Sequence, residues 1–343
     1  MSIDATEPHS VDWKKRLINS LFLLTLLVLS SCGLLYLAVT MPGEGNPDKM
    51  SPVTPELTEL AQGLHDHVNQ LSSAIGERSS GQPIKLAQTA DYIQQHFEQL
   101  GYIPTVRIFG ELQYRNIEVD LYGREKRNEI IVVGAHYDTR WLSPGADDNA
   151  SGIAGLIEIA RILKNQRYTR TIRFIAFANQ EVPSYQRAEM GSMYSAKRSY
   201  ARAELITGMI GLEMIGYYSE KPGSQNYPSL LSRFYPDQGN YIAFVGNLAS
   251  RDLLLNAISH FRAQQIFPSE GLIAPDWAGR TISRSDHGSY WYYDFPAIMV
   301  TDTANYRNPN YHTAADSADK LDYEKMARVV NGLANMIVRL AQD

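Results

Sequence analysis

Five side chains that suit a divalent metal ion are spread along this chain of 343 residues. They are His136 in VVGAHYD, Asp148 in GADDNASG, Glu181 in FANQEV, Glu213 in GLEMIGYY and His312 in NPNYHTAAD. Zinc accepts imidazole nitrogens and carboxylate oxygens together. Two imidazoles and three carboxylates can hold two zinc ions if one carboxylate bridges them, and this is the chemistry that we expect of the five residues.

Hydrophobic periodicity predicts the elements that would position these residues. Strands are predicted at 105–109, 116–121, 129–135, 171–178, 206–212, 240–245 and 296–301, and helices at 54–79, 84–100, 148–163, 188–202, 250–263 and 323–341. Strands that alternate with helices indicate an α/β domain with a largely parallel, buried sheet. His136, Glu181 and Glu213 each follow a predicted strand. Since such sheets place their sites at the carboxyl ends of strands, the two lines of evidence agree.

His136 has an acid two residues later, at Asp138. On an extended segment, residues i and i+2 point the same way, so Asp138 can accept the other imidazole proton and orient the ring. Asp148 stands at a predicted helix start, where acids also occur simply as N-caps. His312 lies in a polar stretch, and by itself it would be read as a solvated loop residue. These positions gain meaning only together.

Glu181 and Glu213 follow or interrupt apolar runs. A carboxylate in such a place is unfavourable unless it is paired, which favours a metal over simple surface charge. Asp286 and His287 form a further acid–histidine pair, which we interpret as supporting or structural. The segment 217–239, rich in Tyr, Pro and Ser, is predicted to form a wall of the cleft beside Glu213, with Trp277 and Arg280 as a further candidate wall.

Taken together, the motifs resemble those of the M28 family of zinc aminopeptidases. The motifs are HYD, GADDNASG, an F-x-A-F strand that ends near an acid, MGSMYSA, LEMIGYYS, SDH and NPNYHTAADSADKLDY, and the resemblance covers residues 84–343. It implies a single globular α/β domain with a mixed sheet flanked by helices. It also implies one zinc ion held by His136, Asp148 and Glu213, a second held by Asp148, Glu181 and His312, and Asp138 as the orienting acid.

Two positions depart from the family pattern. Glu213 stands where the family often has Asp, and either carboxylate can bind zinc. Gln180 stands where the family has the glutamate that takes a proton from the attacking water and passes it to the leaving amine. An amide can orient water but cannot accept its proton, and losing a general base lowers a rate by roughly 10²–10⁴-fold. Glu189 and Asp147 are the nearby acids that could substitute, although neither occupies the expected position.

The resemblance leads to three hypotheses about function. The first is a two-zinc hydrolase that removes N-terminal residues from a peptide substrate. The second is a zinc-binding pseudopeptidase, which binds peptides or a partner protein without efficient cleavage because of Gln180. The third is a glutaminyl-cyclase-like enzyme on the same fold, which would hold a single zinc and would need the same missing acid.

The N-terminal segment indicates a membrane. No charged residue occurs from 17 to 41, Lys14, Lys15 and Arg16 precede that run, and its length suffices to cross a bilayer. The positive flank places the N-terminus in the cytoplasm. The sequence LSSC ending at Cys32 resembles a lipobox, although the apolar run continues beyond it. Both interpretations leave the main domain outside the cytoplasm, in the periplasm or on the cell surface.

We therefore expect a cytoplasmic tail (1–16), a transmembrane anchor or lipoprotein signal (17–41), a linker (42–55) and a peptidase-like domain (56–343). The net charge of −5 and the dispersed basic residues speak against nucleic-acid binding. The single cysteine excludes an intrachain disulfide. Nothing in the sequence indicates an oligomeric state.

Overall fold

A computed structural model of the chain describes residues 13–46, 50–228, 231–274 and 282–342. Trp277 and Arg280 lie outside these ranges, as do residues 1–12 of the expected cytoplasmic tail. The chain divides into two compact units, Met1–Thr40 and Met41–Asp343. Each unit is described by itself.

The first unit contains helix α1 (Trp13–Val39). Its stretch Lys15–Val39, of 25 residues, has a mean hydropathy of 2.3 and contains no buried residue. At a rise of about 1.5 Å per residue, such a helix exceeds the roughly 30 Å of a bilayer's hydrocarbon core. In the described part of the chain it is the one helix with the length and composition to span a membrane. It indicates the secretion pathway, as an anchor or as a signal segment.

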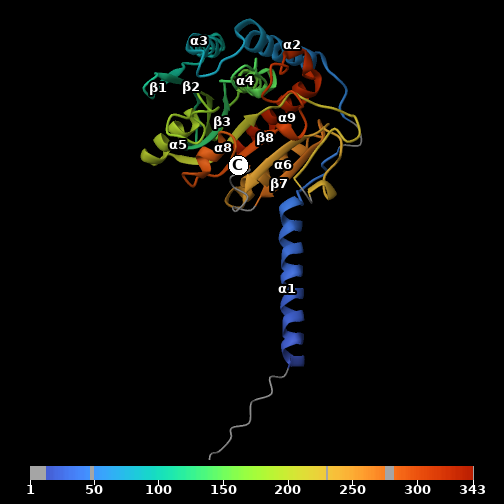
Figure 1. Cartoon of the computed structure of the whole chain (residues 1–343). Coiled ribbons are helices and arrows are strands. Elements are labelled where there is room, and N and C mark those ends of the chain that lie inside the picture. Colours follow the sequence, from blue (N-terminus) through green and yellow to red (C-terminus); the bar gives the residue numbers. More distant parts are fainter. Residues whose placement is uncertain (1–12, 47–49, 229–230, 275–281, 343) are drawn as a thin grey trace, which may run out of the picture. The chain divides into compact units, whose positions relative to one another are not determined.

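The second unit is built on an eight-stranded sheet in the order β1-β2-β4-β3-β5-β8-β6-β7 (Figure 1). The strands are β1 (Thr105–Phe109), β2 (Tyr114–Leu121), β3 (Lys126–His136), β4 (Arg170–Phe177), β5 (Leu205–Glu213), β6 (Ile242–Asn247), β7 (Ser269–Ala274) and β8 (Ala297–Thr301). Strand β3 runs parallel to β4 and β5, as does β5 to β8 and β6 to β7. The pairs β1–β2, β2–β4 and β6–β8 are antiparallel, so the expected mixed, mostly parallel-centred sheet is confirmed.

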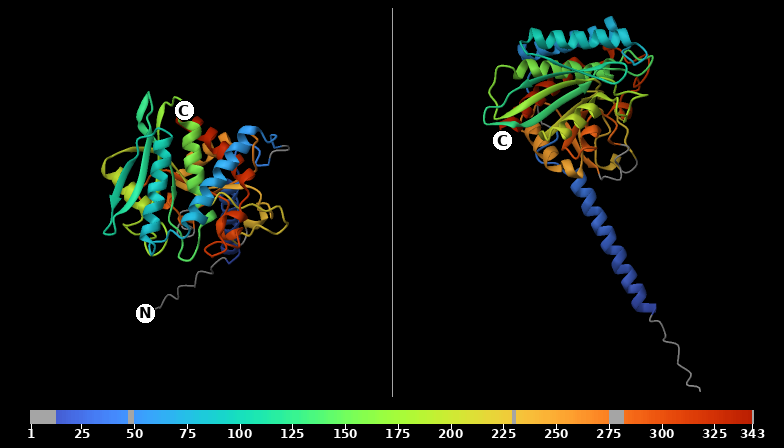
Figure 2. Two further views of the ribbon diagram at one scale, coloured as in Figure 1. Left: turned by 90° about the horizontal axis from the view of Figure 1, so that it is seen from above. Right: turned by 90° about the vertical axis from the view of Figure 1, so that its left-hand side faces the viewer.

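Helices cover both faces of this sheet (Figure 2). One face carries α3 (Pro83–Gln99), α4 (Gly152–Leu163), α6 (Arg251–Arg262) and α9 (Tyr323–Gln342), with α2 (Pro55–Asn69) packed mainly on α9. The other carries α5 (Gly191–Ala201) and the short α8 (His287–Trp291). A large apolar core lies under the first group of helices and a smaller one under the second.

Local sequence explains where several of these helices begin and end. Helix α3 stops at Gly101, which has a φ of 78°, as expected of a C-cap glycine, and Tyr102 N donates back to Phe97 O at 2.9 Å. The predicted helix 54–79 is shorter: a wide turn at Gln70–Ile75 follows α2 and ends at Gly76, whose φ is 81°. Strand β7 and helix α8 were not predicted, because neither has a long apolar run.

Residues 41–45, which were expected to begin a linker, have defined contacts within the second unit. Gly45 O accepts from Ser269 N on the edge strand β7 at 2.7 Å. The Arg262 guanidinium donates to the carbonyls of Met41, Pro42 and Gly43 at 3.5, 3.2 and 3.0 Å. The exposed edge of β7 is therefore partly covered by this segment, here called the edge strap.

Candidate metal centre

The five expected ligand residues meet at one edge of the sheet. His136 ends β3 and Glu213 ends β5, while Glu181 follows the end of β4 by four residues. These three strands are parallel neighbours, so their carboxyl ends lie side by side. Asp148 stands in the turn that leads into α4, and His312 lies in the connection between β8 and α9. The site is thus at the strand ends, as the sequence predicts.

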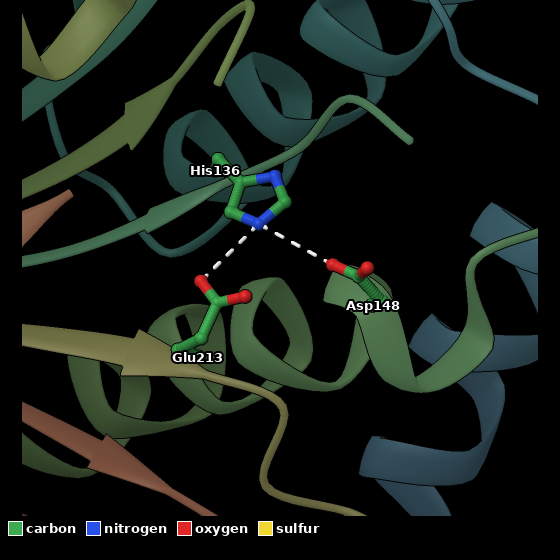
Figure 3. Close-up of side chains that lie close together, drawn as sticks. All are labelled: His136, Asp148 and Glu213. Atoms are coloured by element: carbon green, nitrogen blue, oxygen red, sulfur yellow. Dashed lines mark ion pairs between the residues drawn. The ribbon is translucent and has the colours of Figure 1, made fainter. Parts of the chain in front are cut away.

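The side chains form two groups that share one residue. In the first, His136 Nε2 lies 3.5 Å from Asp148 Oδ1 and 3.3 Å from Glu213 Oε2 (Figure 3). In the second, His312 Nε2 lies 3.0 Å from Asp148 Oδ2 and 2.8 Å from Glu181 Oε1. Asp148 therefore turns one carboxylate oxygen toward each group, which is the arrangement that a bridging ligand needs.

The spacing and the bonding of these atoms fit a metal ion. Zinc bonds of about 2.0 Å in tetrahedral geometry would place neighbouring ligand atoms about 3.3 Å apart. The four contacts above span 2.8–3.5 Å. His136 Nε2, His312 Nε2 and both Asp148 oxygens are buried without a well-aligned hydrogen bond. Buried polar atoms without a partner are unfavourable. Each of the two residue clusters could therefore bind a cation.

The carboxylates of the site have histidines as their partners, which carry a positive charge only when they are protonated. Burial raises the pKa of Asp148 to about 8, and the neighbouring charges of Glu181 and Glu213 act in the same direction. Burial opposes protonation of His312, yet its contacts with Asp148 and Glu181 raise its pKa to about 9. In the metal-free site, protonated imidazoles therefore supply positive charge that a metal would replace, so metal binding should release protons.

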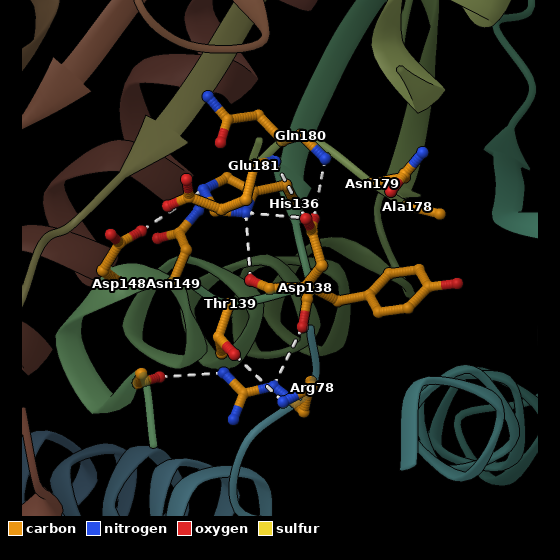
Figure 4. A network of polar contacts seen from close by, with 12 residues as sticks. Arg78, His136, Asp138, Thr139, Asp148, Asn149, Ala178, Asn179, Gln180 and Glu181 are labelled. Carbon is orange, nitrogen blue, oxygen red and sulfur yellow. Dashed lines mark hydrogen bonds and ion pairs between the residues drawn. The ribbon is translucent and has the colours of Figure 1, made fainter. Parts of the chain in front are cut away.

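Asp138 joins two of the strand ends that carry ligands (Figure 4). Its two carboxylate oxygens accept from the backbone N–H groups of Gln180 and Glu181, each at 2.9 Å. His136 Nδ1 lies 3.4 Å from Asp138 Oδ1 and 3.2 Å from the Asp138 backbone oxygen. The predicted proximity of the acid to the ring is present, and the carboxylate also fixes the backbone that presents Glu181.

The GADDNASG segment holds the chain just beyond Glu213. Three of its side chains accept from three successive backbone N–H groups: Asn149 Oδ1 from residue 214, Ser151 Oγ from residue 215 and Asp147 Oδ1 from residue 216, each at 3.0 Å. This contact set aligns the end of β5 with the start of α4. The polar residues of the motif therefore have two roles. Asp148 supplies a candidate ligand, and Asp147, Asn149 and Ser151 position the backbone that follows Glu213.

Arg78 is a buried supporting residue that the sequence analysis missed. Its guanidinium donates to backbone carbonyls on both sides of the ligand segments (Figure 4). The acceptors are the carbonyl oxygens of Leu71, Gly76, Tyr137, Pro144 and Gly145. Because all of these partners are backbone groups, no side-chain pattern in the sequence marks Arg78.

Asp316 and Ser285 also support the candidate ligands, and the sequence did not predict this role. Asp316 accepts from the backbone N–H groups of Asp147 and Asp148, at 2.9 and 3.1 Å, and so fixes the bridging residue. Ser285 Oγ donates to Glu213 Oε2 at 2.5 Å. Asp316 belongs to the quoted C-terminal motif and Ser285 to SDH, but their partners lie far along the chain and could not be assigned.

Gln180 is almost fully buried, and its side-chain amide donates to Arg284 O at 3.0 Å. Neither nearby acid takes its place. Glu189 is exposed and lies beside Gly110 in the β1–β2 turn. Both carboxylate oxygens of Asp147 already accept hydrogen bonds, one from the backbone N–H of residue 216 and the other from Asn308 Nδ2 at 2.7 Å.

The pair Asp286–His287 begins helix α8 and is buried. His287 Nε2 lies 2.7 Å from the Ile282 carbonyl oxygen, which fits the expected structural role.

A pocket of about 180 Å³ opens beside Glu213. Arg284 and Tyr311 line it near the metal centre. The segment 217–239 supplies one of its walls through Gln225, Tyr227 and Tyr235, among others. This agrees with the position predicted for that segment.

Comparisons with known proteins show which sequences and which folds this chain resembles. The uncharacterized protein YfbL of Escherichia coli is 39% identical over 298 residues, which cover 83% of this chain and 90% of YfbL. The aminopeptidase YwaD of Bacillus subtilis is 33% identical over 134 residues, covering 39% of this chain and only 28% of YwaD. BSAP, a zinc aminopeptidase from Bacillus subtilis, has a similar fold with a TM-score of 0.64 at 15% identity, over 82% of this chain and 95% of that one. Residues 116–337 match peptidase family M28. The chain therefore belongs to peptidase family M28.

Proposed function

We propose that this protein is a two-zinc hydrolase that binds peptides by their N-terminal end. His136, Asp148 and Glu213 would hold one ion, and Asp148, Glu181 and His312 the other. The observation that carries the proposal is the Asp148 carboxylate, which directs one oxygen to each group and has no other partner. When bound, the ions would polarise the scissile carbonyl and lower the pKa of a water molecule.

The residues around this centre have separable roles in the proposal. Asp138 orients the His136 ring and holds the backbone of Glu181. Asp316 and Arg78 fix the two segments that bring His136 and Asp148 together. Such support matters because small misplacements of ligands and catalytic groups reduce rates strongly.

Gln180 limits the proton chemistry that this site can perform. Its amide donates to Arg284 O, so a carboxylate at this position would face a carbonyl oxygen unless it were protonated. This contact favours the second candidate function, a zinc-binding member that binds peptides without cleaving them efficiently. The cleaving and the binding form share the same metal centre and differ only in turnover.

The test compares the zinc-loaded chain with its Gln180→Glu variant on a panel of aminoacyl amides, with zinc content measured in parallel. A gain of roughly 10²–10⁴-fold in kcat/KM would place the missing base at this position. Gln186→Glu, an exposed change in the same loop, is the matched control and should have no effect. Efficient turnover without any gain would assign proton acceptance to another group. One zinc per chain instead of two would contradict the two-ion centre and favour the cyclase-like alternative.

For the N-terminal unit we propose an uncleaved anchor over residues 17–41, with the peptidase unit outside the cytoplasm. The apolar composition of α1, in which no residue of the span is buried, and the basic residues in its first turn support this. Mass spectrometry of the mature N-terminus tests it. A mature chain that starts at an acylated Cys32 would contradict the transmembrane anchor.

A further inference from the structure

The pocket beside Glu213 follows a row of side chains across four strands. Glu213 on β5 pairs with Thr301 on β8, Thr301 with Ala243 on β6, and Ala243 with Glu270 on β7. Paired residues project to the same face of a sheet, so the two carboxylates face the same space. Three strand spacings of about 4.8 Å separate them by about 14 Å. The pocket thus has the metal centre at one end and Glu270 at the other.

The walls between these ends are largely aromatic. Tyr227 and Tyr235 stack with ring centroids 5.7 Å apart, and Tyr241 lines the same pocket. Their hydroxyl groups are already engaged: Tyr235 donates to Gly271 O at 2.7 Å, and the Tyr227 and Tyr241 hydroxyls lie 2.8 Å apart. The rings therefore offer mainly apolar surface to a ligand, and not free hydrogen-bonding groups. One face of Tyr241 is covered by the Arg307 guanidinium, 4.6 Å from the ring centroid.

Glu270 stands out at the far end because its charge is incompletely compensated. Its side chain is 25% exposed, and among the described residues its ion-pair partner is Arg262, whose Nη2 lies 3.8 Å away. Arg262 directs its N–H groups to Ser269 and to the carbonyls of the edge strap. Within the described ranges, no donor makes a hydrogen bond to the Glu270 carboxylate. The Glu270 carboxylate is thus a hydrogen-bond acceptor without a donor at the far end of a largely apolar pocket.

We propose that this pocket receives the side chain of the substrate's N-terminal residue and that Glu270 makes it selective for lysine or arginine. The inference rests on the proposed function, because the metal centre is what would hold the main chain of that residue. Aromatic walls accommodate a methylene stem and interact favourably with a cation, and a carboxylate pairs with the charged tip. An apolar tip would instead bury Glu270 without a donor, which is unfavourable.

The experiment measures binding, so that it does not depend on the proton chemistry of Gln180. Lysine, norleucine and tyrosine hydroxamates are titrated by calorimetry into the zinc-loaded full chain. We expect the lysine compound to bind at least about 10-fold more tightly than norleucine, a difference typical of one charge-assisted contact. In Glu270→Gln this ratio should fall to about 1. Glu125→Gln, an exposed acid outside the pocket, is the matched control and should keep it.

Different failures have different meanings in this design. If norleucine or tyrosine hydroxamate binds more tightly than the lysine compound in the unaltered chain, Glu270 does not select a cation and the inference is wrong. It is also wrong if Glu270→Gln weakens all three compounds equally. If none of the three binds to the zinc-loaded chain, the proposed metal centre itself fails, and the pocket assignment with it.

Discussion

Two groups of charged side chains in the second unit are neutralised in different ways. The first, here called the ion cluster, lies on β1, β2, β4, α5 and the turn before β5. Its cations and acids contact one another at 2.7–3.8 Å, and they are Arg107, Arg173, Arg198, Glu118, Asp120 and Glu204. The second is the metal centre, where three carboxylates meet two histidines and several polar atoms lack a partner.

The pKa shifts show the same contrast. Burial acts against ionisation of Glu204, yet the charge of Arg173 and the hydroxyl of Ser199 lower its pKa. Burial raises the pKa of Asp148 to about 8, although its contact with His312 acts in the opposite direction. The ion cluster pairs each of its acids with an arginine, whereas the acids of the metal centre face histidines, which carry charge only when protonated. Perturbed groups that share a cleft in this way are typical of functional sites.

The largest expected effect comes from removing the shared carboxylate with Asp148→Asn. Zinc at 1,000 times its Kd should raise the unfolding free energy of the unaltered chain by about 4 kcal/mol, and the variant should lose this gain because both ions need Asp148. Without metal, the variant should be at least as stable, since it no longer buries a carboxyl group whose pKa is raised by burial. Urea unfolding with and without zinc measures both effects.

Asp120→Asn in the ion cluster is the control for this change, and it should keep the full zinc-dependent gain. A zinc-dependent gain in Asp148→Asn equal to that of the unaltered chain would contradict the bridging role.

The next effect tests the ion cluster. Arg173→Met removes the cation that contacts Asp120 at 2.9 Å and Glu204 at 2.8 Å. Breaking a buried pair from one side leaves uncompensated acids, so the unfolding free energy should fall by about 3–5 kcal/mol. Zinc stoichiometry of the folded fraction should not change, because the cluster does not contact the metal centre. A loss below about 1 kcal/mol would show that solvent or relaxation compensates these acids.

Much of the fold was predictable because its central strands are buried on both faces. The predicted strands 129–135, 171–178 and 206–212 correspond to β3, β4 and β5 within three residues. Strand β7 was missed, since SEGLIA contains Glu270 and Gly271 in place of an apolar run. The antiparallel pairing of β6 with β8 also leaves no local pattern, because it joins segments that are far apart in the sequence, such as Ala243 and Thr301.

The candidate site shows the same division. Glu181 and Glu213 stood out because a carboxylate beside an apolar run is unusual, whereas Asp148 and His312 were identified only from the combined motifs. Arg78 and Asp316 were not, since they act on backbone groups up to 169 residues away. Glu270 was not, because its relation to Glu213 depends on the register of four strands. Side-chain chemistry can be read from sequence, whereas contacts set by strand order cannot.

Glu270 is an intermediate case between the two groups: in the part of the chain that the structure describes, Arg262 is its ion-pair partner and no donor makes a hydrogen bond to its carboxylate. Burial raises its pKa to about 7, and Arg262 only partly opposes this. The folded state therefore binds the proton more tightly than the unfolded state, whose carboxyl has a pKa of about 4.3. Stability should fall as the pH rises from about 4.5 to 7, by an amount on the order of 1–3 kcal/mol.

The measurement is the difference in unfolding free energy between the unaltered metal-free chain and Glu270→Gln at pH 5 and at pH 7.5. Taking the difference cancels the titration of the metal-centre acids. The unaltered chain should lose stability relative to the variant at the higher pH. A difference that does not depend on pH would show that Arg262 already compensates Glu270 fully.

The smallest effect is expected for an ion pair that has the same length as a pair in the ion cluster but is more exposed to solvent. Arg115 Nη1 lies 2.8 Å from Asp91 Oδ1, the same distance as Arg173 to Glu204, yet the Asp91 side chain is 54% exposed. Water already solvates both charges, so Asp91→Asn should change the unfolding free energy by no more than about 0.5 kcal/mol. A loss as large as that of Arg173→Met would mean that distance alone sets these energies. The expected small loss would show that burial decides how far a charged group depends on its partner.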